Sequence, residues 1–425
     1  MIQTGLFSRL VAGTALGACL ALGACASVGA PDAATASPAA QSQAVAALPE
    51  TVILISIDGF RAEYLQRGLT PHLSQMAAEG TSTPMKASFP TVTFPNHYTL
   101  VTGLHPDHHG LVGNNIRDPE LGSFSLGNRA AVTDRRWWDG GEPIWVTAEN
   151  QGVITGTMFW PGSEADVRGV RPTHWAVFDQ SMGGDARVDR LLSWLDLPKE
   201  QRPRLTTLYF DLVDTMGHHH GPNSPQVEDA LRQTDASIGR LMDGLKARGI
   251  ADKTVVIVVS DHGMAATSPD RVTYLDDMMD VSAIEVVYSG PVAMINAAAG
   301  RDAEVEAALV GKHEQMECWR KANVPARLAF GTHPRVSDFV CLASPNWLVG
   351  TRNRAVTRPG GAHGYDNELA DMKAIFIATG PNIVRGASLP NMDSVDVQPL
   401  LGRLLGIEVP KTDGNPEDTL ALTVR

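Results

Sequence analysis

Acidic and imidazole side chains recur where three short apolar runs of the chain end. Histidine nitrogen and carboxylate oxygen are the ligands of zinc-like divalent ions, and several carboxylates in one site indicate more than one cation. A lone Asp after a strand is usually a helix N-cap, so the joint occurrence of these residues carries the prediction. Two of them are four positions apart, a spacing that turns both side chains to one side of a helical turn or compact loop. The residues are Asp58, Asp214, His218, Asp261 and His262.

The stretch SFPTVTFPNHYTL (88–100) holds three hydroxyl side chains, Thr91, Thr93 and Thr99, any of which could be turn chemistry or a nucleophile. The residues after Thr93 predict a helix start, since Pro95 suits the first turn and a threonine just upstream can cap its N–H groups. A helix N-terminus also favours a phosphoryl group. A threonine hydroxyl needs activation, and coordination to a divalent cation lowers its pKa.

Four near-continuous apolar runs predict parallel strands buried on both faces of a sheet. Between the second and third runs, the segment 225–249 has an amphipathic helical pattern that ends at a glycine. Strand, helix and strand in succession predict an α/β fold, a doubly wound and mostly parallel sheet with helices on both faces. The carboxyl ends of such strands form the edge where ligands bind. The runs cover residues 51–58, 205–212, 254–261 and 373–380.

Six motifs in the chain resemble, in the same order, those of the nucleotide pyrophosphatase/phosphodiesterases of the alkaline phosphatase superfamily. They span about residues 50–405. The resemblance implies an alkaline phosphatase-like fold and, through the pattern T-x-T-F-P-N, a nucleophile at Thr93. The motifs are SIDGFRAEYL, FPTVTFPNHYTLVTGLHPDHHGLVGN, WPGSE, DLVDTMGHHHGP, SDHGM and GAHGYDN. Within the second motif, the DHH run at 107–109 is expected in a surface turn.

The resemblance also implies two zinc ions and a nucleotide pocket. One ion would be held by Asp214, His218 and His363. The other would be held by Asp58, Asp261 and His262, with the oxygen of Thr93 completing the site. Asn114, rather than its neighbour Asn115, matches the family asparagine that hydrogen-bonds a non-bridging phosphate oxygen. The implied nucleoside monophosphate pocket lies at Phe94, Asn114, Trp160 and Tyr209, although Trp160 could equally be a core residue.

The implied activity is hydrolysis of nucleotide phosphodiester and pyrophosphate bonds through a covalent threonine intermediate, for example nucleoside triphosphate to monophosphate plus pyrophosphate. No basic residue accompanies the motifs near Thr93, Asn114 or Asp214, which favours diesters over monoesters. A lipid-headgroup phosphodiesterase acting on lysophospholipids is an alternative on the same scaffold. A surface binding lipoprotein without turnover is an alternative of another class. A sulfatase is disfavoured because the formylglycine motif is absent at the nucleophile position.

Charge narrows the choice of partner. The 425 residues carry a net charge of -12, which argues against binding nucleic-acid duplexes or anionic lipid through a basic surface. The charge of a phosphate substrate must therefore be met locally, as metal ions would do. Apolar residues make up 43% of the chain, enough for one large elaborated domain.

The N-terminal residues predict export. Residues 1–25 resemble a lipoprotein-type signal peptide of a bacterium with Cys25 as the lipidated residue, and the alternative is cleavage to a soluble periplasmic protein. Residues 26–49 predict a flexible tether to a catalytic domain at 50–425. We therefore expect a periplasmic or outer-membrane-anchored protein that meets the membrane only through its N-terminal lipid.

The remaining cysteines, Cys318 and Cys341, lie between two of the motifs, in a segment at 265–360 that is expected to form a smaller capping subregion. In an oxidising compartment these two cysteines are expected to form a disulfide. Two buried thiols are the alternative, and no neighbouring ligand suggests a metal site there.

Overall fold

The computed structural model describes residues 47–424. The predicted signal peptide (1–25) lies outside the described residues, and so does the predicted tether up to residue 46. Across residues 47–424, every helix is too short or too polar to span a membrane.

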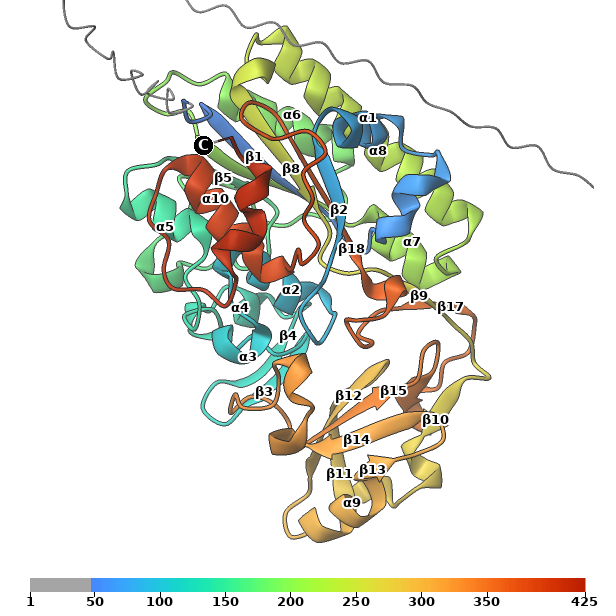
Figure 1. The fold of residues 1–425 in the computed structure, drawn as a ribbon. Coiled ribbons are helices and arrows are strands. Elements are labelled where there is room, and N and C mark those ends of the chain that lie inside the picture. The colour runs from blue at the N-terminus through green and yellow to red at the C-terminus, as the bar shows by residue number, and fades with distance from the viewer. Residues whose placement is uncertain (1–46, 425) are drawn as a thin grey trace, which may run out of the picture. The chain divides into compact units, whose positions relative to one another are not determined.

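The central element of the fold is a seven-stranded sheet in the order β2-β18-β8-β1-β7-β5-β6 (Figure 1). Five adjacent strands, from β8 to β6, are parallel, which confirms the predicted mostly parallel sheet. The run at 373–380 was also predicted to be parallel, and this was wrong, because β18 pairs antiparallel with both β8 and β2. An apolar run buried on both faces carries no information on strand direction. The strands are β1 (Thr51–Ile57), β2 (Thr81–Met85), β5 (Thr155–Met158), β6 (His174–Trp175), β7 (Leu205–Phe210), β8 (Thr254–Val259) and β18 (Ala374–Thr379).

Helices cover both faces of this sheet, as the alternation along β1 shows. Val52 and Leu54 pack into one apolar cluster with α2, α5 and α10, whereas Ile53, Ile55 and Ile57 pack into another with α1, α6 and α8. The predicted helix at 225–249 is α8, and it ends two residues before Gly249. The helices are α1 (Pro71–Glu79), α2 (Thr93–Thr102), α5 (Ile144–Asn150), α6 (Gly184–Leu195), α8 (Pro225–Ala247) and α10 (Val397–Leu405).

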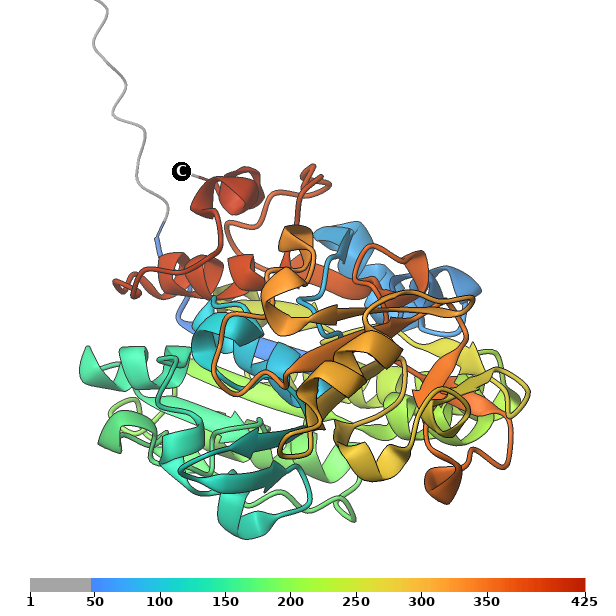
Figure 2. The same cartoon turned by 90° about the horizontal axis from the view of Figure 1, so that it is seen from below.

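A second, antiparallel sheet forms within residues 265–360, in the order β11-β12-β15-β14-β13. Figure 1 shows it below the central sheet, and in the view from below in Figure 2 it lies in front of the main body; helix α9 (Asp302–Leu309) packs on it. Cys318 and Cys341 occupy directly opposed positions on β14 and β15 and are joined by a disulfide. The strands are β11 (Ile284–Tyr288), β12 (Val292–Ala297), β13 (Gly311–Lys312), β14 (Met316–Arg320) and β15 (Phe339–Ala343).

The DHH run forms hydrogen bonds to the segment that joins β14 and β15. Its expected place in a surface turn is wrong, because α3 (Pro106–His109) buries both Asp107 and His109. The Asp107 carboxylate accepts hydrogen bonds from the backbone N–H groups of residues 331–333 at 2.8–3.1 Å. Burial alone would raise the pKa of Asp107, but these hydrogen bonds and that from the Thr332 hydroxyl lower it below its usual value. The carboxylate therefore ties the two parts of the fold together.

Candidate metal centre and active site

Three carboxylates meet at the carboxyl edge of the central sheet. Asp58 follows β1, Asp261 follows β8, and Asp214 lies in the first turn of α7 (Leu212–His220), which follows β7. Each has one buried oxygen, Oδ1 of Asp58 and Asp214 and Oδ2 of Asp261, that accepts no hydrogen bond in the structure. Burial, followed by the charges of Asp261 and Asp214, raises the pKa of Asp58, and burial also raises that of Asp214. Buried carboxylate oxygens without a donor indicate a cation.

The first predicted ligand set comes together around Asp214. Its Oδ1 lies 3.4 Å from Nε2 of His218 and 3.7 Å from Nε2 of His363, and the two Nε2 atoms are 3.0 Å apart. His218 Nδ1 lies 2.9 Å from the carbonyl oxygen of Gly361, and His363 Nδ1 lies 2.8 Å from that of Thr91. A carbonyl oxygen only accepts, so each Nδ1 carries the hydrogen and each Nε2 presents a lone pair. Such backbone contacts orient metal-binding histidines.

The second predicted ligand set comes together around His262. Its Nε2 lies 3.0 Å from Oδ2 of Asp261, 3.5 Å from Oδ1 of Asp58 and 3.2 Å from Oγ1 of Thr93. The other ring nitrogen, Nδ1, donates to the carbonyl of Gly263 at 2.9 Å, so Nε2 again carries a lone pair. Burial opposes protonation of this ring, but the charge of Asp261 outweighs it and raises the pKa of His262.

The two ligand sets adjoin, because the rings of His262 and His363 stack with centroids 3.5 Å apart. His262 and His363 also lie close enough to Asp214 for the three to share one ion. His218 fits the same ion as Asp214 and His363, because its Nε2 lies nearer to the Asp214 carboxylate than the Nε2 of His363 does. The set of carboxylate oxygens and neutral imidazoles fits zinc. Three carboxylate oxygens that accept no hydrogen bond are enough acceptors for two cations.

A further buried histidine, His97, lies near Asp58 and Asp261 but has no free ring nitrogen. Its Nδ1 donates to the carbonyl of Thr93 at 2.9 Å, and its Nε2 lies 2.8 Å from Oγ of Ser56. A histidine with both nitrogens engaged cannot ligate a metal. We therefore place His97 outside both ligand sets. The sequence prediction did not include it, although it lies within the second motif.

Thr93 is the first residue of α2, and Val92 occupies the N-cap. The interpretation of Thr93 as a helix cap is therefore wrong, since its backbone is already helical and its side chain caps no N–H group. Instead, the N–H of Phe94 donates to Oδ1 of Asn114 at 2.9 Å. Within residues 47–424 the amide nitrogen of Asn114 donates to no protein acceptor, so it can meet a substrate oxygen. Pro95 lies in the first helical turn as predicted.

The other two threonines of the stretch are engaged elsewhere. Thr91 Oγ1 donates to the carbonyl of Tyr365 at 3.0 Å, and Thr99 Oγ1 lies 3.1 Å from Nε2 of His109. Both side chains are fully buried. Of the three hydroxyls, only that of Thr93 lies among the predicted metal ligands.

An aromatic pocket of about 250 Å³ opens beside Thr93. Three of the four predicted substrate-binding residues line it, namely Phe94, Trp160 and Tyr209. Trp160 is 2% exposed and donates from Nε1 to the carbonyl of His97, so it serves as both core and wall. The hydroxyl of Tyr209 donates to Oδ2 of Asp58 at 2.7 Å, which couples this wall to the metal centre.

Other residues that line the pocket were missed from the sequence. Phe178 is 40% exposed, and its ring lies against Phe159 and Tyr209 at centroid distances of 5.3 and 6.1 Å. Arg129 forms an ion pair with the carboxylate of Glu164, which is 6% exposed. Glu164 belongs to the motif WPGSE and could have been suspected, whereas nothing near Phe178 in the sequence marks it.

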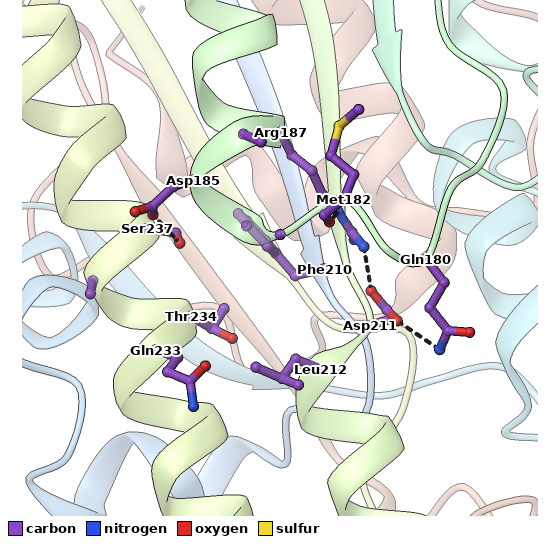
Figure 3. A pocket seen from close by; sticks show the side chains of 14 residues that line it. Gln180, Met182, Asp185, Arg187, Phe210, Asp211, Leu212, Gln233, Thr234 and Ser237 are labelled. Carbon is purple, nitrogen blue, oxygen red and sulfur yellow. Dashed lines mark hydrogen bonds and ion pairs between the residues drawn. The ribbon is translucent and has the colours of Figure 1, made fainter.

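A larger hollow of about 650 Å³ lies next to this pocket, between α6, α8 and the start of α7 (Figure 3). The two share Gln180 and Asp211, and Asp211 accepts from Gln180 and pairs with Arg187. None of the predicted site residues lines the larger hollow, so volume alone does not identify the site.

The second sheet approaches the metal centre without entering the pocket. Of the residues that line the pocket in the described part of the chain, none comes from 265–360. Burial and then the charge of Asp214 raise the pKa of Tyr288, at the end of β11, to about 12. The role of residues 265–360 as a cap therefore stays a prediction.

Comparison with known proteins gives relatives for most of the chain. A family model described as type I phosphodiesterase / nucleotide pyrophosphatase matches residues 52–366. An uncharacterized pyrophosphatase/phosphodiesterase of Schizosaccharomyces pombe is 37% identical over 388 residues, which cover 88% of this chain and 80% of that protein. Ectonucleotide pyrophosphatase/phosphodiesterase family member 3 of Bos taurus is 37% identical over 85% of this chain, but the chain spans only 43% of that longer protein.

Solved structures show the same fold. Human ectonucleotide pyrophosphatase / phosphodiesterase 5 matches with a TM-score of 0.84 and 34% identity, over 88% of this chain and 99% of that one. An inactive threonine-to-alanine variant of the murine protein, solved in complex with AMP, matches with a TM-score of 0.83 and 32% identity, over 88% and 100%.

Proposed function

This chain belongs to the type I phosphodiesterase / nucleotide pyrophosphatase family, and from that premise we propose that it uses two zinc ions and a covalent threonine intermediate to hydrolyse nucleotide diesters and pyrophosphates. Thr93 Oγ1 would attack phosphorus, the bond to the leaving oxygen would break, and water would then cleave the phospho-threonine ester to release a nucleoside monophosphate. The position of Thr93 Oγ1 carries the proposal, since it lies 3.2 Å from His262 Nε2 at the first residue of a helix.

The side chains around Thr93 have separate tasks in this reaction. His262 Nε2, a ligand of the second proposed ion, lies 3.2 Å from Thr93 Oγ1 and would hold that ion beside the hydroxyl, and the amide nitrogen of Asn114 donates to a phosphate oxygen. The start of α2 adds the partial positive charge of a helix N-terminus. Zinc ions held by the six Asp and His ligands would lower the pKa of the Thr93 hydroxyl and stabilise charge on the leaving oxygen.

The charge of the pocket supports a diester substrate. Arg129 is the single Lys or Arg among the described pocket-lining residues, and it is paired with Glu164. A monoester dianion would find no unpaired cationic side chain there. Aromatic walls such as Phe94 and Phe178 suit a nucleobase, for which stacking is worth about 1–3 kcal/mol. The AMP bound to the murine relative supports a nucleotide as the ligand of this pocket.

The decisive variant is Thr93→Ala, which is expected to abolish hydrolysis of bis-(p-nitrophenyl) phosphate while zinc content, measured by mass spectrometry, stays near wild type. Thr93→Ser is the matched control and should keep part of the activity because it keeps a hydroxyl. Full activity in Thr93→Ala would refute the mechanism. No activity in metal-replete wild type would instead favour the non-catalytic binding protein.

Substrate class needs its own comparison. Initial rates should be measured on a nucleoside triphosphate, a lysophospholipid and a phosphate monoester under one condition. We expect the nucleotide to be hydrolysed fastest. A faster rate on the lysophospholipid would favour the lipid-headgroup alternative, and a monoester rate as high as the nucleotide rate would contradict the diester proposal.

Export is proposed on a separate observation. The Cys318–Cys341 disulfide suits an oxidising compartment such as the periplasm. Lipid anchoring at Cys25 is the accompanying proposal, and Cys25→Ala should move the protein from the membrane fraction to the soluble fraction. An unchanged fractionation of this variant would contradict the anchor.

A further inference from the structure

A serine, a histidine and an aspartate form a buried row directly behind the nucleophile. Ser56 Oγ lies 2.8 Å from Nε2 of His97, and His97 Nδ1 lies 3.2 Å from Oδ2 of Asp261. The order resembles that of a hydrolase triad. All three side chains are 0% exposed, and Ser56 lies on the buried strand β1, so no substrate reaches its hydroxyl. The row must therefore do something other than nucleophilic attack.

The hydrogen bonds of His97 define what its ring can do. Nδ1 faces two acceptors, the carbonyl of Thr93 at 2.9 Å and the carboxylate of Asp261 at 3.2 Å, so it carries the hydrogen. The N–H points at the carbonyl, while the carboxylate oxygen lies beside it and accepts no hydrogen bond. That oxygen stays free for a metal ion. The hydroxyl of Ser56 holds the opposite side of the ring.

His97 also contacts the wall of the substrate pocket. Its ring packs edge-on against Trp160 and Tyr209 at centroid distances of 5.2 and 5.1 Å. Trp160 donates to the carbonyl of His97, and Tyr209 donates to the metal ligand Asp58. The buried side chain of His97 thus contacts the first residue of α2, the proposed metal ligand Asp261 and two residues of the pocket wall.

We propose that His97 is a positioning residue that keeps the backbone of Thr93 and the carboxylate of Asp261 at a fixed separation, with Ser56 holding its ring. This inference rests on the proposed function for the role of Thr93, but its effect on metal binding does not. Groups that orient metal ligands from behind change metal affinity by about 10–100-fold when removed. An ordinary core histidine would contribute to stability alone.

Two near-isosteric variants separate the two sides of the ring. The amide nitrogen of His97→Asn can replace Nδ1–H and keep the hydrogen bond to the carbonyl of Thr93. The amide of His97→Gln reaches the position of Nε2 and keeps the contact with Ser56, but it leaves the Thr93 carbonyl without its donor and removes the ring nitrogen that lies 3.2 Å from Asp261 Oδ2. Zinc affinity is measured by competition with a chromogenic chelator. The kinetic constants kcat and KM are measured with bis-(p-nitrophenyl) phosphate as substrate, and the melting temperature is measured on metal-free protein.

We expect His97→Gln to lower zinc affinity about 10–100-fold and kcat at least as much, with KM nearly unchanged. His97→Asn should keep both zinc affinity and kcat within about 10-fold of wild type, even if both variants melt equally early. Equal losses in the two variants, tracking their melting temperatures, would overturn the proposal, as would wild-type zinc affinity in His97→Gln. If wild type proves inactive, the proposed function fails, whereas the zinc affinities still decide the role of His97.

Discussion

Nε2 of His218 and Nε2 of His363 lie 3.0 Å apart, and neither carries a hydrogen, because both rings donate from Nδ1 to backbone carbonyls. Two lone pairs at this distance repel each other unless a proton or a cation lies between them. The carboxylate of Asp214 lies next to both nitrogens. The arrangement therefore fits a cation held by the two nitrogens and the carboxylate.

Zinc is expected to stabilise the folded protein, since the ligand atoms converge only in the folded chain. At a free concentration 100 times the dissociation constant, it should add about 2.7 kcal/mol to the free energy of unfolding. Thermal melts of chelator-treated protein with and without added zinc measure this. His218→Ala should lose one of two zinc equivalents, and the exposed neighbour His219→Ala should keep both. Equal zinc content in these two variants would contradict the first ligand set.

Asp58→Asn is expected to stabilise the metal-free protein at pH 7 while removing activity. The pKa of Asp58 is raised by burial and by the charges of Asp261 and Asp214, so the folded state holds this proton more tightly than the unfolded state does. Such a group costs stability as pH rises from its unfolded pKa near 4 to its higher folded pKa. The variant avoids that cost, so its free energy of unfolding should exceed that of wild type at pH 7, as measured by denaturant unfolding of the metal-free proteins.

The control for Asp58→Asn is the pH dependence itself. Below pH 4 the carboxyl is protonated in both states, so the variant and wild type should unfold alike. With zinc present the sign should reverse, because the variant has lost a ligand. A metal-free variant that is less stable than wild type at pH 7 would show that Asp58 is held by donors rather than repelled by its neighbours.

Five of the six proposed ligand residues could be grouped from the sequence because they follow strands, where an open α/β sheet brings distant residues together, whereas His363 came only from the family resemblance. The i, i+4 spacing of Asp214 and His218 was informative because α7 is regular at that point. The direction of β18 could not be predicted, since its residues are buried on both faces whichever way it runs. The apolar pattern therefore predicted which residues lie at the carboxyl edge of the sheet, but it did not predict the direction of every strand.

Residues that act through packing were harder to predict. His97 lies in a recognised motif, but only its three-dimensional neighbours, Ser56 and Asp261, distinguish it from a core histidine. Asp107 looked like part of a surface turn because its hydrogen-bond donors come from residues 331–333, more than 200 positions away. Phe178 ends the short apolar run WAVF, which belongs to none of the motifs, and it joins the pocket only through the folded path of the chain.

Phe178→Ala is expected to weaken nucleotide binding. Its ring is 40% exposed at the pocket and lies against Phe159 and Tyr209, so it offers a stacking face at little cost in stability. Loss of one stacking contact should raise KM for a nucleoside triphosphate about 5–100-fold with a smaller change in kcat. Val177→Ala, at an adjacent residue that is 55% exposed and outside the pocket lining, is the matched control. An equal rise in KM for both variants would exclude stacking by Phe178.

Loss of the Cys318–Cys341 disulfide is expected to lower stability without affecting catalysis at 25 °C. The bond closes a loop with a sequence separation of 23 between opposed strands, so its removal should cost about 3 kcal/mol through the added freedom of the unfolded chain. Catalysis should persist because no described pocket-lining residue comes from this sheet. The Cys318→Ala/Cys341→Ala double variant is compared, by denaturant unfolding and kcat/KM, with wild type refolded under reducing conditions, which keeps both side chains. Both should be similarly destabilised, and a loss of kcat/KM in the folded double variant would show that the second sheet takes part in the reaction.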